Sequence, residues 1–325
     1  MSSASERVYA GVDLGGTKIA AALGTADGRI LAEGEVPTLS YEGSDAVLVR
    51  MAGLLNDLAK QVGRAPQAVG VGVPGTVDLG EGIIRFLPNV PGHWPDVPVR
   101  ATLSPLVGGV PVYLLNDARM ATLGELAYGQ GRGVSTMVFF TLGTGIGGGV
   151  VVDGKLRLGA LGSAGELGHM TILPDGPVCA CGNPGCLETL ASGPAITGQG
   201  VWLMRCGRAP HLYDLVEGNA DRVSPAEMVA AAKAGDDSVH DVLIRAFSYL
   251  GIGIANQVVT LHPELIVLGG GMAAIGDLLF DTVRAVVKRR VGMFPPDDVR
   301  IEPSVLGSQA GIYGGIALAA QGGQV

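Results

Sequence analysis

The feature that most constrains the fold of this chain is a strand–turn–strand pattern that occurs twice. Near its start, an apolar stretch (8–13) is followed by a glycine-rich turn, a second stretch (19–23), an Asp-Gly pair and a third stretch (30–36). A similar order of strand, glycine-rich turn, strand, Asp-Gly and strand begins again at Thr136. Asp-Gly between two such stretches is a strong hairpin signal. The sequence therefore predicts two related halves that each begin with antiparallel strands.

Helical and extended stretches alternate along the rest of the chain. Apolar spacing predicts helices over 44–62, 118–128, 193–205, 225–234, 238–261, 273–290 and 309–320. Short apolar runs predict strands over 68–73, 110–117, 136–143, 264–271 and 299–305. Such alternation is typical of α/β folds. We expect a small N-terminal lobe from residues 1–119 and 308–325, and a large lobe from residues 120–307 that contains a metal loop at 169–186.

Composition and charge exclude several classes of protein. Hydrophobic residues make up 47% of the chain and charged residues 16%, so a sizeable core can form. The net charge of -8 and the lack of a Lys/Arg run argue against a nucleic-acid partner. No stretch reaches the roughly 18 uninterrupted apolar residues of a membrane span, and the N-terminus does not resemble a secretory signal. We expect a cytoplasmic protein with neither nucleic-acid nor membrane partners.

Three glycine-rich turns follow apolar strands, at 13–18, 142–149 and 268–272. A lone Gly-Gly pair is usually only a tight turn. Gly143, Gly145 and Gly148 satisfy the dinucleotide-binding spacing, but that motif needs a helix directly after it. The residues that follow are β-branched and end in an Asp-Gly pair. We therefore predict a phosphate cradle built by two hairpins, in which backbone N–H groups converge on an anion.

Side chains beside these turns suit a nucleotide and its metal. Asp13 is predicted to hold Mg²⁺ through water, because Mg²⁺ keeps much of its hydration shell. Thr17 and Thr144 offer hydroxyl donors, and the bare backbone of "LGGGM" would accept a flat adenine. The predicted nucleotide-binding residues are Asp13, Gly15, Gly16, Thr17, Lys18, Gly143, Thr144, Gly145, Gly270 and Gly271.

Three of the four cysteines lie between residues 179 and 186, after a histidine. His169, Cys179, Cys181 and Cys186 form the spacing H-x9-C-x-C-x4-C. One imidazole and three thiolates are a common set of structural zinc ligands. Buried free cysteines beside a core histidine, or a redox-active pair, are the alternatives. Zinc would fix a loop that has little core of its own.

Two polar residues, Asn116 and Asp117, end the predicted strand 110–117. An aspartate at the end of a strand is well placed to act as a general base toward a hydroxyl group. The alternative is that the pair caps the helix that follows.

Several of these stretches together resemble a known family. The duplicated hairpin with "DLGGT" is similar to the phosphate-binding elements of the sugar-kinase, actin and Hsp70 fold. "GELGHM" followed by "CACGNPGCLETLASG" resembles the signature of the ROK family (repressor, open reading frame, kinase), as does "LGTGIGGGVVVDGKLRLGALGSAGELGH". The resemblance covers nearly the whole chain. Within the family, "RFLPNVPGHW" and "LLNDARMATLGE" are most similar to the bacterial glucokinases.

This resemblance implies a two-lobed, actin-like and ribonuclease H-like ATPase fold with a ligand cleft between the lobes. It implies that the chain phosphorylates the 6-hydroxyl of glucose with ATP and Mg²⁺, with Asp117 as the general base and a structural zinc ion. It also implies that His169 touches both zinc and sugar, and that the protein is a homodimer or homotetramer. The implied sugar-binding residues are Gly75, Asn89, Asn116, Asp117, Glu166, His169 and Glu188.

Three alternatives stay open within the family. The substrate could be mannose, fructose, N-acetylglucosamine or N-acetylmannosamine, or the protein could sense sugar without catalysis. The family's repressors carry an added N-terminal helix-turn-helix domain, and only 12 residues precede Asp13 here. Arg119 and Met120 also depart from the commoner pattern "NDANAAA", which puts the local helix packing and the specificity in question.

Overall fold

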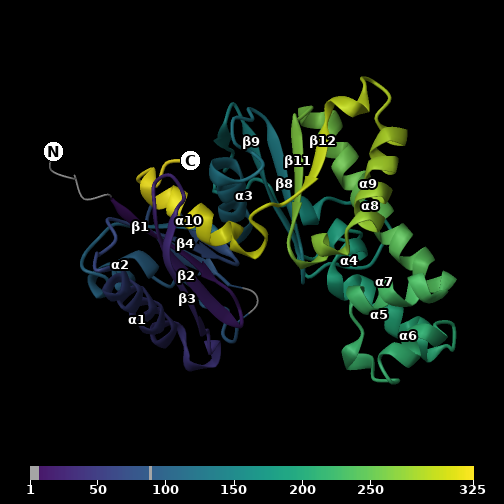
Figure 1. Ribbon diagram of the computed structural model, residues 1–325, viewed down its shortest axis with the longest axis horizontal. Coiled ribbons are helices and arrows are strands. Elements are labelled where there is room, and N and C mark those ends of the chain that lie inside the picture. Colours follow the sequence, from purple (N-terminus) through teal and green to yellow (C-terminus); the bar gives the residue numbers. More distant parts are fainter. Residues whose placement is uncertain (1–6, 88–89) are drawn as a thin grey trace. The chain divides into compact units, whose positions relative to one another are not determined.

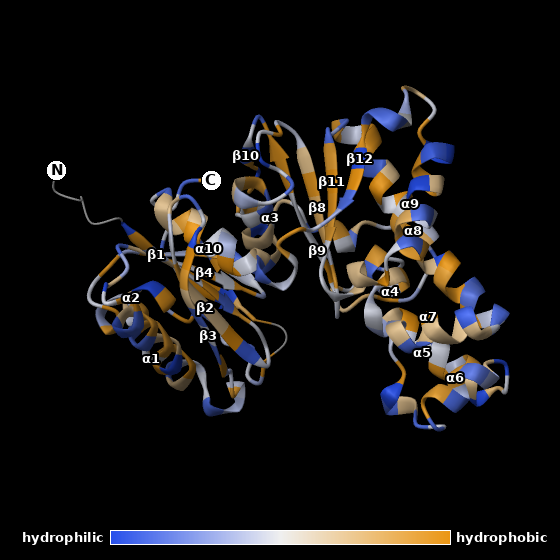
Figure 2. Cartoon of the chain, in the orientation of Figure 1, coloured by the Kyte–Doolittle hydropathy of each residue, from blue (hydrophilic) through white to orange (hydrophobic). Residues whose placement is uncertain are grey.

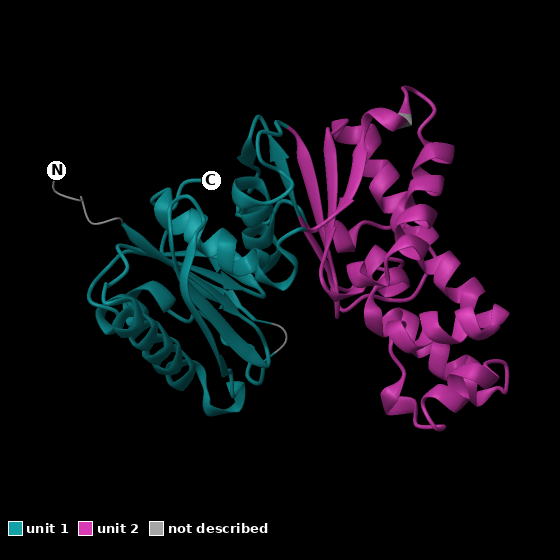
Figure 3. Ribbon diagram, in the orientation of Figure 1, with its two compact units in different colours: residues 1–135, 149–165, 305–325 teal, residues 136–148, 166–304 magenta. Residues whose placement is uncertain are grey.

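The computed structural model describes residues 7–87 and 90–325 and divides into two compact units (Figure 3). Unit 1 comprises Met1–Ser135, Gly149–Gly165 and Val305–Val325, and unit 2 comprises Thr136–Gly148 and Glu166–Ser304. The sequence predicts that 120–135, 149–165 and 305–307 belong to the other lobe. They belong to unit 1 because of how the helix that begins at Asp117 packs, as described below.

Unit 1 is built on a five-stranded sheet with the order β3-β2-β1-β4-β7 (Figure 1). Its strands are β1 (Val8–Leu14), β2 (Lys18–Thr25), β3 (Ile30–Pro37), β4 (Val69–Val73) and β7 (Val112–Asn116). The first three strands are antiparallel, whereas β1, β4 and β7 run parallel. A separate small hairpin joins β5 (Thr76–Asp78) to β6 (Ile83–Phe86). The first predicted strand–turn–strand unit is thus confirmed.

Helices cover both faces of this sheet. The helices of unit 1 are α1 (Ser44–Val62), α2 (Val99–Leu106), α3 (Asp117–Tyr128) and α10 (Ala310–Ala320). Along β1, Val12 belongs to the core under α1 and α2, whereas Tyr9 packs with Ile312 of α10. This alternation follows from the two-residue period of a strand. Figure 2 shows the resulting apolar character of β1 and β4.

Helix α10 lies so close to its neighbours that side chains are excluded at the contact. A Cβ atom on Gly11 of β1 would lie 2.0 Å from the carbonyl oxygen of Ile312. A Cβ atom on Gly314 of α10 would lie 1.8 Å from the carbonyl oxygen of Met120 in α3. Both distances are impossible for a real side chain, so glycine is required there. This packing fixes α3 against α10 and thus places α3 in unit 1.

A second five-stranded sheet has the order β10-β9-β8-β11-β12. Its strands are β8 (Met137–Leu142), β9 (Ile146–Val152), β10 (Lys155–Leu156), β11 (Leu265–Gly269) and β12 (Arg300–Pro303). Strand β11 runs parallel to β8 and β12, and β10 pairs antiparallel with the end of β9. The second predicted unit is confirmed, and a strand rather than a helix follows Gly143–Gly145. The dinucleotide-binding motif is therefore absent at this turn.

The helices of unit 2 are α4 (Leu187–Ala191), α5 (Gly193–Arg205), α6 (Pro210–Leu215), α7 (Pro225–Ala234), α8 (Asp237–Leu261) and α9 (Asp277–Arg290). By length and composition α8 is apolar enough to cross a membrane, but 56% of its most apolar window is buried in the fold. It packs against α4, α5, α7 and α9, as a core helix does.

The predicted helix 273–290 is interrupted. A short 3₁₀ helix spans Gly271–Ile275, Gly276 adopts φ 77° and ψ -141°, and α9 then begins at Asp277. Only glycine adopts such dihedral angles readily, so the chain breaks there. Further 3₁₀ turns are Ser40–Glu42, Leu167–His169, Ala220–Arg222, Pro296–Asp298 and Gly307–Gln309. The other predicted helices and strands are confirmed to within a few residues, while α2, α4, α6 and the β5–β6 hairpin were not predicted because their patterns are short.

Candidate functional site

The first glycine-rich turn joins β1 to β2 in unit 1. The Gly15 N–H donates to the carbonyl oxygen of Lys18 at 2.9 Å. Thr38, which is fully buried, holds the turn from outside. Its hydroxyl donates to the carbonyl oxygen of Gly15 at 2.7 Å, and its N–H donates to that of Thr17 at 2.8 Å. No sequence pattern points to Thr38, because its role depends on how the end of β3 meets this turn.

Asp13 and Lys18 place opposite charges beside this turn. Burial raises the pKa of the Asp13 carboxyl, and the positive charge of Lys18 partly opposes that rise. The Lys18 ammonium is exposed and lies 2.6 Å from Glu35. Gly311, in the first turn of α10, packs against the Asp13 carboxyl. A largely desolvated carboxyl beside a glycine-rich turn suits a hydrated cation that accompanies phosphate.

The second glycine-rich turn joins β8 to β9 and is clamped by an acidic side chain from α4. The Ile146 N–H donates to Oε2 of Glu188 at 2.9 Å. A Cβ atom on Gly145 would lie 2.5 Å from the same oxygen, so glycine leaves room for the carboxylate. The Gly193 N–H donates to the carbonyl oxygen of Gly143 at 2.9 Å. Glu188 therefore supports the turn that also carries Thr144.

The third glycine-rich turn lies beside the second one. Strands β8 and β11 pair in parallel, so Gly270 and Gly271 follow β11 next to the end of β8. Gly270 has φ 79°, and a Cβ atom there would lie 2.4 Å from the carbonyl oxygen of Leu142. The predicted nucleotide-binding residues thus form two groups. Residues 13–18 come together in unit 1, whereas 143–145 and 270–271 come together in unit 2.

The four predicted metal ligands converge in unit 2. One side-chain atom from each of His169, Cys179, Cys181 and Cys186 lies within 4.8 Å of all the others. Nδ1 of His169 is 3.5 Å from Sγ of Cys179, and the Sγ atoms of Cys181 and Cys186 are 3.7 Å apart. Tetrahedral zinc with Zn–S bonds of about 2.3 Å places its sulfur ligands about 3.8 Å apart. The spacing and the donor set therefore fit a zinc ion.

The thiols of this cluster differ in acidity. Burial raises the pKa of Cys179 to about 11, whereas a hydrogen bond from the Asn183 backbone lowers that of Cys181. A thiol must lose its proton before it binds zinc, so metal binding here releases protons. All four cysteines are free thiols.

The loop that carries the four predicted metal ligands (169–186, the metal-ligand loop) has little apolar core of its own. Backbone hydrogen bonds hold it, from Cys179 N–H to the carbonyl oxygen of Asn183 and from Ile172 N–H to that of Gly185. Val178 is 75% exposed. Oε1 of Glu188 lies 3.9 Å from Sγ of Cys179. Through its two oxygens, Glu188 thus connects the metal-ligand loop to the second glycine-rich turn.

The two nitrogens of the His169 ring face different groups. Nδ1 is directed toward Cys179, and Nε2 lies 4.0 Å from Oε2 of Glu166, too far for a hydrogen bond. An imidazole in this orientation can bind a metal with one nitrogen and meet a ligand with the other. Glu166, His169 and Glu188 therefore lie around one end of the metal-ligand loop.

Asn116 and Asp117 lie where β7 passes into α3. Oδ1 of Asn116 accepts from the N–H groups of Ala118 at 3.0 Å and Arg119 at 3.4 Å, so Asn116 is the helix N-cap. Asp117 is the first residue of the helix, and its Oδ1 accepts from Ala118 N–H at 2.8 Å. Both side chains thus accept from N–H groups in the first turn of α3, with Asn116 at the N-cap position.

Gly75 lies beside Asn116 in unit 1. Nδ2 of Asn116 donates to the carbonyl oxygen of Gly75 at 3.2 Å. The predicted sugar-binding residues Gly75, Asn116 and Asp117 thus lie together. Asn89, which was also predicted, lies outside the described residues.

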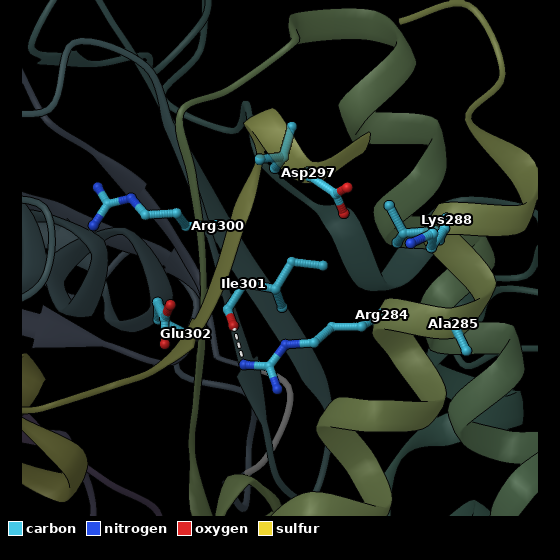
Figure 4. A pocket seen from close by; sticks show the side chains of 9 residues that line it. Arg284, Ala285, Lys288, Asp297, Arg300, Ile301 and Glu302 are labelled. Carbon is cyan, nitrogen blue, oxygen red and sulfur yellow. Dashed lines mark hydrogen bonds between the residues drawn. The ribbon is translucent and has the colours of Figure 1, made fainter. Parts of the chain in front are cut away.

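Two surface pockets lie elsewhere. One of about 390 Å³ lies between α9 and β12 in unit 2, where Arg284 donates to the carbonyl oxygen of Ile301 at 2.7 Å (Figure 4). Its charged side chains are of both signs. A second of about 530 Å³ lies in unit 1 between α3 and the β9–β10 turn. Neither is lined by any of the predicted site residues.

Comparisons with known proteins identify the family of the chain. The profile of the ROK family matches residues 9–322. The chain is 36% identical over 311 residues to a glucokinase of Thermotoga maritima, covering 95% of this chain and 96% of that protein. It is 32% identical to a xylose repressor of Caldicellulosiruptor bescii, covering 95% of this chain and 77% of the repressor.

A solved structure is similar over the same length. It is a ROK family glucokinase from Streptomyces griseus in complex with glucose and AMPPNP, with a TM-score of 0.82 and 33% identity, and the match covers 97% of this chain and 99% of that one. The predicted α/β class, with the two-lobed, actin-like and ribonuclease H-like ATPase fold, is thereby confirmed.

Proposed function

The chain belongs to the ROK family, and on that premise we propose that it is a glucokinase, an ATP-dependent sugar kinase that phosphorylates the 6-hydroxyl of glucose. One observation carries this proposal. Nearly the whole chain is similar to proteins named glucokinase, and one of them has been crystallised with glucose and an ATP analogue.

Asp117 is the proposed general base. A sugar hydroxyl is a weak nucleophile, so phosphoryl transfer needs in-line positioning, neutralised phosphate charge and a base beside the hydroxyl. Asn116 supplies the cap of α3 and holds the carbonyl of Gly75. This arrangement supports a fixed position for Asp117 at the end of β7. We assign hexose contacts to Gly75, Asn116 and Asp117 in unit 1.

Glycine-rich turns are the proposed nucleotide contacts. In unit 1, Asp13, Gly15, Gly16, Thr17 and Lys18 bind the phosphates and Mg²⁺, which neutralises phosphate charge when bound. In unit 2, the contacts are Gly143, Thr144, Gly145, Gly270 and Gly271. Backbone N–H groups at such turns bind anions without a charged side chain.

The metal-ligand loop is the proposed organiser of the remaining sugar contacts. His169, Cys179, Cys181 and Cys186 hold zinc, which when bound supplies a fixed four-ligand junction. Glu166, Nε2 of His169 and Glu188 contact the hexose beside this junction. A pocket whose polar groups are fixed in advance binds its ligand at a lower entropic cost. The proposal also includes a cytoplasmic location and a homodimer or homotetramer.

The decisive experiment replaces the proposed base. We expect Asp117→Asn to lower kcat by about 10²- to 10⁴-fold, the usual contribution of a general base. Glucose binding, measured by calorimetry, should persist. Asp153→Asn, in an exposed turn of unit 1, is the matched control and should keep full activity.

A panel of hexoses tests the substrate. Wild-type protein that released no ADP with any hexose, ATP and Mg²⁺ would refute the kinase assignment. A clear preference for mannose, fructose or an N-acetylated hexosamine would instead change only the substrate. Full activity of Asp117→Asn would remove the assigned base.

A further inference from the structure

Arg119 is a charged side chain in the interior of unit 1. Only 2% of it is exposed, although arginine is rarely buried to this degree. It lies in the first turn of α3, two residues after Asp117. Its guanidinium stays protonated in proteins, so a buried arginine needs fixed hydrogen-bond acceptors around it. The commoner pattern "NDANAAA" has an asparagine at this position.

Among the residues that the structure describes, three oxygen atoms accept hydrogen bonds from this guanidinium. Nε donates to the carbonyl oxygen of Ala164 at 2.8 Å, and Nη2 donates to that of Ser163 at 2.8 Å. Nη1 donates to Oδ1 of Asn116 at 2.7 Å. The planar group thus joins two neighbouring carbonyls of one loop to the cap of α3. A lysine has a single ammonium group and cannot reproduce this fork.

The bond to Asn116 extends the network further. Oδ1 of Asn116 is also the N-cap acceptor, and its Nδ2 donates to the carbonyl oxygen of Gly75. The amide therefore cannot rotate without breaking hydrogen bonds on both sides. A continuous chain of bonds runs from Gly75 through Asn116 and Arg119 to Ser163 and Ala164. Asn116 and Arg119 lie on either side of Asp117 along the chain, and the loop with Ser163 and Ala164 continues directly into Glu166.

We propose that Arg119 is a positioning residue for phosphoryl transfer. Its side chain fixes the start of α3, and with it Asp117, relative to Gly75 between β4 and β5 and to the loop that contains Ser163 and Ala164. This inference rests on the proposed function. Arg119 acts through Asn116 and the two carbonyls, and it does not contact the substrate. The chain thereby uses a buried cation to hold the residues around its base in place.

Kinetics of Arg119→Ala and Arg119→Lys test this role. We expect kcat/KM for glucose to fall about 10²-fold in Arg119→Ala, because displacement by about 1 Å costs that much. In Arg119→Lys, kcat/KM for glucose should fall by less. The KM for ATP should change little in both variants. Guanidinium chloride, at concentrations too low to unfold the protein, should restore part of the activity of Arg119→Ala by entering the space left by the side chain.

Leu123→Ala is the matched control. Leu123 is buried in α3 one turn further on and makes none of these hydrogen bonds. It should lower Tm but leave kcat and KM of the folded enzyme unchanged. If both Arg119 variants behaved like this control, with lower Tm and unchanged kinetics, Arg119 would be structural only and the inference would be wrong.

The remaining outcomes are also decisive. If Arg119→Ala does not fold, unchanged glucose kinetics in Arg119→Lys overturn the inference, and a selective loss of kcat/KM for glucose supports it. Absence of guanidinium rescue in a folded Arg119→Ala counts against it. A wild-type protein without kinase activity would refute the proposed function, whereas an active wild type with unaffected Arg119 variants would refute this inference alone.

Discussion

The two hairpin turns that begin the two halves of the molecule are alike in sequence and differ in what supports them. Both follow a buried strand and lead into a second strand. In unit 1, the support is Thr38, a neutral buried residue at the end of the same sheet. In unit 2, the support is Glu188, a carboxylate that also lies against Cys179.

This difference indicates that only one of the two turns depends on the metal-ligand loop. A disturbance of the zinc ligands can reach the Gly143–Gly145 turn through Glu188. Among the described residues of unit 1, the turn at Gly15 has no such connection. Changes in the metal site should therefore weaken nucleotide binding through unit 2, in addition to weakening sugar binding.

Among the substitutions that test this difference between the two turns, loss of a zinc ligand should lower activity the most. We expect Cys181→Ser to lose zinc and to lower kcat/KM by about 100-fold or more, since even residues that only support metal ligands cost 10- to 100-fold. The KM values for glucose and ATP should both rise. Metal analysis and steady-state kinetics measure these changes.

Cys206→Ser is the control for that substitution, because Cys206 is an exposed cysteine outside the metal-ligand loop. It should keep both zinc and activity. Fully active wild-type protein that contained no zinc would contradict the role of the loop.

Substitution of Glu188, which holds the second turn, should have the next largest effect on activity. Glu188→Gln replaces a charged acceptor for the Ile146 N–H with a neutral one, and charged hydrogen bonds are about twice as strong. A loss of about 1 kcal/mol would raise the KM for ATP about 5-fold. The KM for glucose should rise as well.

Glu302→Gln removes a charge from β12 in the same unit and should change neither constant. If Glu188→Gln raised the KM for glucose but left the KM for ATP unchanged, Glu188 would be a sugar ligand without the predicted link to the turn.

The support of the first turn should contribute less. Thr38→Val keeps the shape of the side chain but removes the hydroxyl that donates to Gly15. We expect a loss of about 0.5 kcal/mol in turn stability and an increase of about 2-fold in the KM for ATP. Bound zinc should stay at the wild-type level. A loss of zinc in Thr38→Val would break the distinction between the two turns.

The smallest effect should come from the charges beside the first turn. Burial raises the pKa of Asp13, and Lys18 opposes this rise. Because ionised Asp13 is proposed to hold Mg²⁺, activity should fall as the pH drops through this raised pKa. Lys18→Met removes the opposing charge, so the acid limb of kcat/KM should move to higher pH. The shift should be small because Lys18 is exposed and screened by solvent.

The contribution of Asp13 to the free energy of unfolding should change with pH in the opposite direction to activity. Its pKa is higher in the folded state than in the unfolded chain, so the folded state takes up the proton first. Folding should therefore gain stability from this group as the pH falls through the folded pKa. An acid limb that did not move in Lys18→Met, together with no such gain in denaturant unfolding, would contradict the raised pKa of Asp13 and the influence of Lys18 on it.

Local sequence determined most of the secondary structure and the composition of the candidate site. Strand and helix periodicity gave α1, α5 and α7 with their observed bounds, and Asp-Gly pairs gave the hairpins. The spacing of His169 and the three cysteines was enough to predict a convergent cluster. These features depend on residues close together in the chain, so the sequence alone carries the signal.

Only the tertiary structure decided which side chains hold the site in place. Arg119 meets Ala164 across 45 residues, Asn116 meets Gly75 across 41, and Ile146 meets Glu188 across 42. Partners that far apart are brought together by packing, such as the close contact of α10 with α3. Periodicity records which face of an element is buried, but it does not record which distant carbonyl or amide that face will meet.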